Sequence, residues 1–212
     1  MTVAGTTPPE HEVRAVVATV VDSVLDERAD ETTTRPAIGT VEEDPAELVT
    51  PSGKGSAPLA DVAVGGDHGG FHLKQRIAAE LREHGFTVHD CGTDTEESVD
   101  YPDYAHAVAG LVARGGCRWG ILVDGAGIGS AIAANKVPGV RAATCWDVSS
   151  ARNSREHNHA NVLALGAGLL GENLALQIVQ AWLSTAWGGG RHARRVEKIT
   201  EIERRYLKDG AP

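Results

Sequence analysis

The 212-residue sequence has no stretch that approaches the roughly 20 apolar residues needed to cross a membrane, which excludes a membrane-spanning protein. It also has no excess of basic residues: the formal net charge is −9, which argues against nucleic acid as the main partner. The three cysteines, Cys91, Cys117 and Cys145, are an odd number without short spacings. A disulfide framework is therefore not expected, and a reducing cytoplasm is the expected location. The opening residues are polar and acidic, so no secretion signal is expected.

The composition is that of a globular protein, with 42% apolar and 23% charged residues. The acidity is concentrated at the front of the chain. Residues 1–60 contain 11 acidic and 4 basic residues, a net charge of −7, whereas the remaining residues contain 18 and 16, a net charge of −2.

Residues 9–29 have apolar side chains at the i, i+3, i+4, i+7 spacing that places them on one face of a helix. These side chains are Val13, Val16, Val17, Val20, Val21, Val24 and Leu25. Prolines and small or acidic residues then interrupt any periodicity over residues 30–60. The pattern predicts an amphipathic helix within residues 1–29, followed by a flexible linker over residues 30–60.

From Asp61 onward, short apolar runs alternate with segments of helical spacing. Strands are predicted at 61–65, 86–92, 118–125, 140–146 and 161–166, and helices at 71–85, 104–115, 129–136, 148–156, 172–185 and 191–208. This alternation predicts an α/β domain over residues 61–212, built on a doubly wound, Rossmann-like parallel sheet of five strands with helices on both faces. Ligands of such sheets bind beyond the carboxyl ends of the strands, so the loops there are the candidate site.

The loop after the first strand contains Asp67 and His68 among four glycines, Gly65, Gly66, Gly69 and Gly70. Glycines allow a backbone to approach a ligand closely. Asp67 is therefore a candidate to bind hydroxyl groups, and His68 is a candidate to bind an anion near a helix N-terminus. The alternative is a tight turn in which Asp67 caps the following helix.

The third strand ends in the glycine-rich turn of residues 124–130, which opens a helix. Its N–H groups are candidates to hold an anion or a developing oxyanion. Asp124 stands at the mouth of a buried strand and is a candidate general base, the alternative being a cap of the next helix. The spacing of the glycines and their place after the third strand differ from the dinucleotide-binding fingerprint.

Two further polar segments lie near the end of the chain. His157 and His159 have no third ligand at a recognisable spacing, so no metal site is expected. Arg191 and Arg195 are four residues apart and share one helical face, which suits a phosphate group. The alternative for this arginine pair is a solvated basic helix end.

Five segments together resemble the ribose-5-phosphate isomerase type B family, which includes related sugar-phosphate isomerases. They are GGDHGGFHLK (65–74), GTDTEESVDYPDYA (92–105), ANKVPGVRAA (134–143), REHNHANVLALG (155–166) and GGRHARRVEKI (189–199). The resemblance implies a homodimer with its active site between subunits, and interconversion of an aldose phosphate and a ketose phosphate through an enediol without metal or another cofactor. The expected reaction is ribose 5-phosphate to ribulose 5-phosphate.

The resemblance also implies roles for individual residues. His157 would open the sugar ring, whereas Asp67, Tyr101 and Asn158 would contact sugar hydroxyl groups. His68, Arg191 and Arg195 would bind the phosphate. The turn formed by Gly125, Gly127, Gly129 and Ser130 would be the hole that holds the enediolate.

Three positions depart from the family pattern. Asp124 stands where many members have a cysteine base, Ala126 where they often have threonine, and Gly168 where they often have a phosphate-binding arginine. A carboxylate is able to shuttle a proton, but an aspartate has an ordinary pKa of about 3.9, which burial would have to raise to make a strong base. These departures leave two alternatives open: an isomerase of a four- or six-carbon sugar phosphate, and a non-catalytic sugar-phosphate-binding or scaffold protein.

The helix predicted within residues 9–29, together with its linker, resembles the tags that carry enzymes into bacterial microcompartments. It implies a shell or cargo protein as a partner, and a location inside such a compartment. Its polar face is acidic, which disfavours a membrane surface. A helix packed on its own dimer and a disordered extension are the alternatives.

Overall fold

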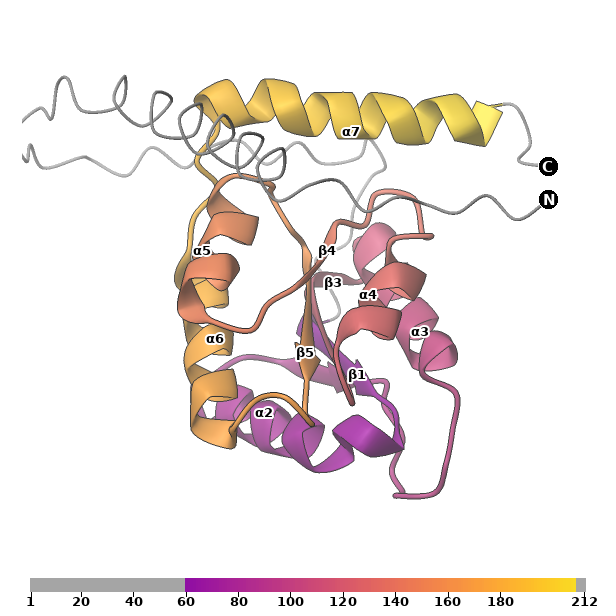
Figure 1. Ribbon diagram of the computed structural model, residues 1–212, viewed down its shortest axis with the longest axis vertical. Helices are drawn as coiled ribbons and strands as arrows, with labels where there is room; N and C mark the ends of the chain where they lie inside the picture. Colours follow the sequence, from indigo (N-terminus) through magenta and orange to yellow (C-terminus); the bar gives the residue numbers. More distant parts are fainter. Residues whose placement is uncertain (1–59, 209–212) are drawn as a thin grey trace, which may run out of the picture. The chain divides into compact units, whose positions relative to one another are not determined.

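The computed structural model describes residues 60–208, so the helix predicted within residues 9–29 and nearly all of the predicted linker lie outside the described residues (Figure 1). The strands are β1 (Ala60–Gly66), β2 (Val88–Asp90), β3 (Cys117–Asp124), β4 (Ala142–Thr144) and β5 (Val162–Gly166). The helices are the 3-10 turn η2 (His68–Gly70), α2 (Phe71–Glu83), α3 (Tyr101–Ala113), α4 (Ile128–Ala134), α5 (Val148–Glu156), α6 (Glu172–Ser184) and α7 (Gly190–Lys208).

The five strands form one parallel sheet in the order β2-β1-β3-β5-β4, which confirms the predicted fold class. Three parts of the prediction need correction. The first strand begins at Ala60, which the sequence pattern assigned to the linker. Helix α3 begins at Tyr101 rather than residue 104, because the fixed φ of Pro102 suits a first helical turn; Asp100 occupies the N-cap position without a side-chain hydrogen bond to the helix. The edge strands β2 and β4 are three residues long, shorter than predicted, and each pairs on one side only.

Alternate residues of the central strands enter two separate cores, one on each face of the sheet. On one face, strand residues such as Val64, Ile121 and Leu163 pack with α2, α5 and α6. On the other face, residues such as Ala63 and Leu122 pack with α3 and α4. Both faces of the central strands are therefore buried, as expected for a parallel sheet.

The carboxyl ends of β1, β3 and β5 lie side by side, with Gly66 paired to Val123 and Asp124 paired to Gly166. The loop after β1 passes very close to β3. A Cβ atom at Gly70 would stand 2.0 Å from the carbonyl oxygen of Val123. Glycine is therefore required here to bring the first two candidate loops together.

The long helix α7 lies at the opposite end of the sheet, beyond the amino ends of the strands (Figure 1). The backbone N–H of Gly188, just before α7, donates to the carbonyl of Glu156 at the end of α5. Within α7, the carboxylate of Glu203 accepts the N–H of Gly139. Among the helices of residues 60–208, none combines the length and the apolar character needed to cross a membrane.

Candidate active site

Asp124 ends β3 with its carboxylate turned onto the turn that follows. Oδ1 accepts the backbone N–H groups of Ala126, at 2.8 Å, and Gly127, and Oδ2 accepts the N–H of Ser130 at 3.0 Å. The side chain is only 6% exposed. This arrangement matches the capping alternative that the sequence left open, because the carboxylate binds the first turn of α4.

Burial acts to raise the pKa of Asp124, but the hydrogen bonds from Ser130, Gly127 and Ala126 outweigh burial and hold the pKa below its ordinary value of 3.8. Hydrogen bonds that stabilise an ionised carboxylate have this effect. In the free chain Asp124 is therefore an ionised but weak base. The rise in pKa that a strong base requires is absent from this arrangement.

The turn around these N–H groups depends on its glycines and is covered by Tyr101. Gly127 has a φ of +75°, and a Cβ atom there would stand 2.8 Å from the backbone of Leu165. A Cβ atom at Gly129 would stand 2.6 Å from the ring of Tyr101, which extends from the first turn of α3 and is 40% exposed. The predicted residues Tyr101, Gly127 and Gly129 therefore lie together.

Asp67 and His68 lie next to the same turn. Asp67 is buried and accepts the N–H of Gly70 at 3.1 Å, and a Cβ atom at Gly69 would stand 3.4 Å from both Asp67 Oδ1 and the backbone nitrogen of Gly125. His68 Nδ1 lies 3.2 Å from the N–H of Val99, which donates to it. A neutral His68 ring therefore carries its proton on Nε2 and is able to donate it to a ligand.

These residues form a carboxyl-edge cluster, which we define as Asp67, His68, Tyr101, Asp124, Gly125, Gly127, Gly129 and Ser130. The other predicted residues, His157, Asn158, Arg191 and Arg195, form an amino-edge cluster at the start of β5 and of α7. The five residues of β5 separate the two edges of the sheet by ~16 Å. One copy of the chain thus contains both clusters but does not bring them together.

His157 caps the end of α5 and contacts two side chains that the sequence pattern did not single out. Its ring stacks on that of His192, with centroids 4.2 Å apart and planes at 6°. Its Nδ1 lies 2.9 Å from Nδ2 of Asn153, one helical turn earlier. An amide donor at Nδ1 places the proton of a neutral ring on Nε2. The i, i+4 spacing of Asn153 and His157 was a usable signal for this contact.

His159 and Trp187 complete the amino edge. Their rings stack with centroids 4.7 Å apart, and Trp187 also lies against His192. Burial, and then the charges of Arg141 and Arg155, lower the pKa of His159 to about 4. Burial and the neighbouring His157 lower the pKa of His192. Across residues 60–208, no three His, Cys, Asp or Glu side chains gather as a metal site requires.

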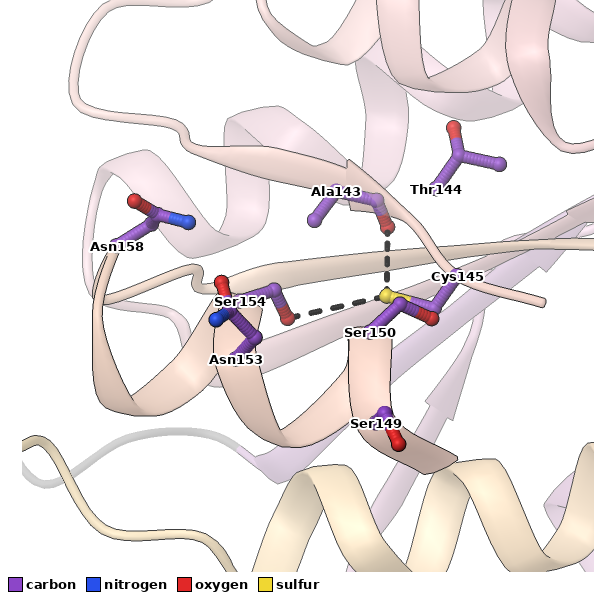
Figure 2. A pocket seen from close by; sticks show the side chains of 8 residues that line it. All are labelled: Ala143, Thr144, Cys145, Ser149, Ser150, Asn153, Ser154 and Asn158. Atoms are coloured by element: carbon purple, nitrogen blue, oxygen red, sulfur yellow. Dashed lines mark hydrogen bonds between the residues drawn. The ribbon is translucent and has the colours of Figure 1, made fainter. Parts of the chain in front are cut away.

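A neutral polar pocket of about 500 Å³ lies between β4 and α5 (Figure 2). It is lined by Ala143, Thr144, Cys145, Ser149, Ser150, Asn153, Ser154 and Asn158. Cys145 Sγ lies 3.8 Å from both the carbonyl of Ala143 and the hydroxyl of Ser154, and Thr144 donates to the carbonyl of Gly127 at 2.9 Å. With no charged side chain in its lining, this pocket does not suit a phosphate group.

Comparison with known proteins gives one consistent match. Residues 62–199 match the family model described as Ribose/Galactose Isomerase. The chain is 51% identical over 147 residues to ribose-5-phosphate isomerase B of Escherichia coli, and 43% identical over 146 residues to D-erythrulose-4-phosphate isomerase of Pectobacterium atrosepticum. These matches cover 69% and 68% of this chain, and 99% and 96% of the relatives. The structure of Clostridium thermocellum ribose-5-phosphate isomerase B is similar with a TM-score of 0.68 and 53% identity, over 69% of this chain and 99% of that one.

Proposed function

Because the chain belongs to the ribose/galactose isomerase family, we propose that it interconverts ribose 5-phosphate and ribulose 5-phosphate through an enediolate, without a metal or another cofactor. One observation carries this proposal: in the carboxyl-edge cluster a buried carboxylate, Asp124, stands beside the N–H groups of a glycine-rich turn. A carboxylate moves protons, and such N–H groups stabilise an oxyanion.

The reaction divides between the two clusters. His157 opens the sugar ring by proton transfer, for which a ring with its proton on Nε2 is suited. Asp124 then takes the proton from C2, the electron pair of the C2–H bond forms the C1–C2 double bond, and O1 takes the negative charge. Asp124 returns the proton to C1, while the O2 proton passes to O1, and the ketose results.

The remaining predicted residues bind the substrate. Asp67, Tyr101 and Asn158 contact the sugar hydroxyl groups, and Gly125, Gly127, Gly129 and Ser130 form the enediolate hole. Arg191, Arg195 and His68 hold the phosphate, which suits guanidinium groups and an Nε2–H donor.

The separation of the two clusters by ~16 Å supports a homodimer with two active sites between its subunits. In each site the carboxyl-edge cluster of one copy meets the amino-edge cluster of the other. A symmetric pair satisfies both sites at once, because each copy provides both clusters. Assembly of such dimers into a higher oligomer is compatible with this arrangement.

A shorter or longer sugar phosphate is the second candidate substrate. The Pectobacterium relative is named for a four-carbon sugar phosphate. At Gly168, where many members have an arginine, the backbone N–H binds the carbonyl of Gly125 at 3.0 Å, and there is no side chain to reach a phosphate. Sugar-phosphate binding without any turnover would instead support the non-catalytic alternative.

We further propose that residues 9–29 direct the enzyme into a bacterial microcompartment by binding a shell or cargo protein. Two facts support this role: the apolar stripe of these residues, and their position before the region shared with the relatives. The relatives match over 96–99% of their own length without this segment.

The test of the isomerase is conversion of ribose 5-phosphate to ribulose 5-phosphate by the full chain after treatment with a chelator. We expect wild-type turnover and a loss of roughly 100-fold or more in Asp124→Asn, which keeps the shape of the side chain but is not a base. A panel of four- and six-carbon aldose phosphates separates the candidate substrates. If the protein binds sugar phosphates but converts none of them, the non-catalytic alternative is favoured.

A further inference from the structure

The carboxylate of Asp124 occupies two N–H donors of the expected enediolate hole, those of Gly127 and Ser130, together with that of the adjacent Ala126. Oδ1 holds the N–H groups of Ala126 and Gly127, and Oδ2 holds that of Ser130. Each N–H group has a single hydrogen to donate. These three donors therefore cannot serve both the carboxylate and a substrate oxyanion at full strength.

We propose that the substrate and Asp124 exchange at these three N–H groups, so that the carboxylate is released as a base only when a sugar oxygen occupies the hole. This inference rests on the proposed function, because it concerns the enediolate of the same reaction. O1 of the open-chain aldose takes the N–H groups of Ala126, Gly127 and Ser130. The released carboxylate then accepts the C2 proton while the electron pair of the C2–H bond forms the C1–C2 double bond and the charge moves to O1.

Burial gives this exchange its effect on basicity. The hydrogen bonds from the Ser130 side chain and from the N–H groups of Gly127, Ala126 and Ser130 hold the pKa of Asp124 down, whereas burial acts in the opposite direction. A carboxylate that loses these donors while its side chain stays covered is therefore a stronger base. The titratable groups on the loops packed around it are Asp67, His68 and Tyr101.

The rival explanation is that Asp124 is only a helix cap, and the chain contains a matched control for it. Asp147 caps α5 by accepting the N–H of Ser150 at 2.6 Å, and its hydrogen bonds also lower its pKa. Asp147 is exposed and lies outside both clusters. Asp147→Ala therefore removes a comparable cap without opening the hole.

The experiment measures binding of the hydroxamate of 4-phospho-D-erythronic acid, whose planar O–C–N–O group copies the enediolate. Exchange predicts that Asp124→Ala binds this hydroxamate about tenfold more tightly than wild type, because no internal carboxylate competes for the N–H groups. The same variant loses about 100-fold or more of its turnover. Asp147→Ala binds the hydroxamate within about twofold of wild type.

If Asp124→Ala folds like wild type and binds the hydroxamate equally or more weakly, the proposed exchange is wrong. It is also wrong if the hydroxamate binds neither protein. If Asp124→Ala does not fold, Asp124→Cys replaces it, because a neutral thiol also leaves the hole without a carboxylate, and the same tighter binding is expected. If wild-type protein isomerises no sugar phosphate, the proposed function is wrong. The ratio of the hydroxamate affinities of Asp124→Ala and wild type still tests the exchange in that case.

A second measurement follows the ionisation of Asp124 itself in wild-type protein. In wild-type protein labelled with ¹³C at the aspartate carboxyl carbons, the Asp124 signal, assigned by comparison with Asp124→Asn, is titrated with and without the hydroxamate. Exchange predicts a midpoint below 3.8 in the free protein and a higher midpoint in the complex, because the carboxylate has lost its N–H donors there. An unchanged midpoint would overturn it.

Discussion

The imidazole rings of His157 and His192 stack face to face, with centroids 4.2 Å apart and planes at 6°. One ring belongs to the end of α5 and the other to the first turn of α7, so the contact joins two helices at the amino edge of the sheet. The stack fixes the orientation of His157, the residue proposed to open the sugar ring. Two stacked rings are also costly to protonate together, because like charges repel.

The stack predicts that ring shape at position 192 matters more than its nitrogens. We expect His192→Phe, which keeps a flat ring, to retain kcat within about threefold, whereas His192→Ala loses about tenfold because His157 is no longer held. The measurement is kcat and KM for ribose 5-phosphate and for open-chain substrate analogues. If both variants lose activity equally, and through KM alone, His192 binds the phosphate instead of positioning His157.

Asn153 predicts a related effect on the same ring. Its Nδ2 lies 2.9 Å from Nδ1 of His157, an arrangement that favours the tautomer with the proton on Nε2. Asn153→Asp would favour the opposite placement of the proton, because a carboxylate accepts a hydrogen bond from Nδ1–H. We expect a loss of roughly tenfold in kcat and an Nδ1 signal in ¹⁵N NMR spectra that changes from the unprotonated to the protonated type. Asn153→Gln, a longer amide, is the control for loss of side-chain packing.

The stability of the protein should depend on pH through His159. Its pKa is about 4 in the folded chain, against an ordinary value of 6.5. Between these values the unfolded chain binds a proton that the folded chain does not, so stability is full above pH 6.5 and is lost as the pH falls towards 4. Because the ring is partly exposed, we expect a loss on the order of 1–2 kcal/mol.

His159→Asn tests this expectation without straining the backbone, because His159 has a φ of +50°, which asparagine tolerates. Urea unfolding of the variant should show a smaller decrease between pH 6.5 and 4.5 than wild type shows. His192, whose pKa is also lowered, contributes in the same direction and leaves a residual slope. An unchanged slope in the variant would mean that His159 is not neutral in the folded chain.

The close approach of η2 to β3 predicts that Gly70 is required for folding. A Cβ atom there would stand 2.0 Å from the carbonyl oxygen of Val123 and 2.5 Å from its carbonyl carbon, so a backbone segment of the close-packed interior would have to shift. We expect Gly70→Ala to lower the free energy of unfolding by about 3 kcal/mol or more. Gly171→Ala is the control, because a Cβ atom at Gly171 meets nothing within 4 Å, and its cost should stay near 0.5 kcal/mol.

The sequence was a good guide to the elements because hydrophobic periodicity reports burial directly. The helix of residues 148–156 was predicted with the bounds that α5 has, and each central strand differed from its prediction by one residue at one or both ends. The edge strands β2 and β4 were predicted too long, since apolar residues before them, such as Phe86 and Val140, are packed in the two cores but lie outside the paired residues of the sheet. Periodicity does not distinguish these two kinds of burial.

The site was predictable only in part. Asp124 was found from its place at a strand end, but the effect of its surroundings on its pKa depends on where three N–H groups point, which no sequence pattern contains. His192 was not predicted, because its place in the sequence between Arg191 and Arg195 does not distinguish it from a solvated residue of the same helix. Its contact with His157 depends on how α7 meets α5, which is a matter of tertiary packing.

A mixed-subunit experiment tests the proposed division of the site between two copies. Asp124→Asn disables the carboxyl-edge cluster, and Arg195→Ala disables the amino-edge cluster, so each homodimer should be nearly inactive. When the two variants are unfolded together and refolded, half of the dimers contain one copy of each. Each mixed dimer has one site with both defects and one site with none, because the edges come from different copies. We therefore expect about one quarter of wild-type activity to return. A site built from a single chain would leave both of its edges in the same copy, and the mixture would then stay as inactive as its components.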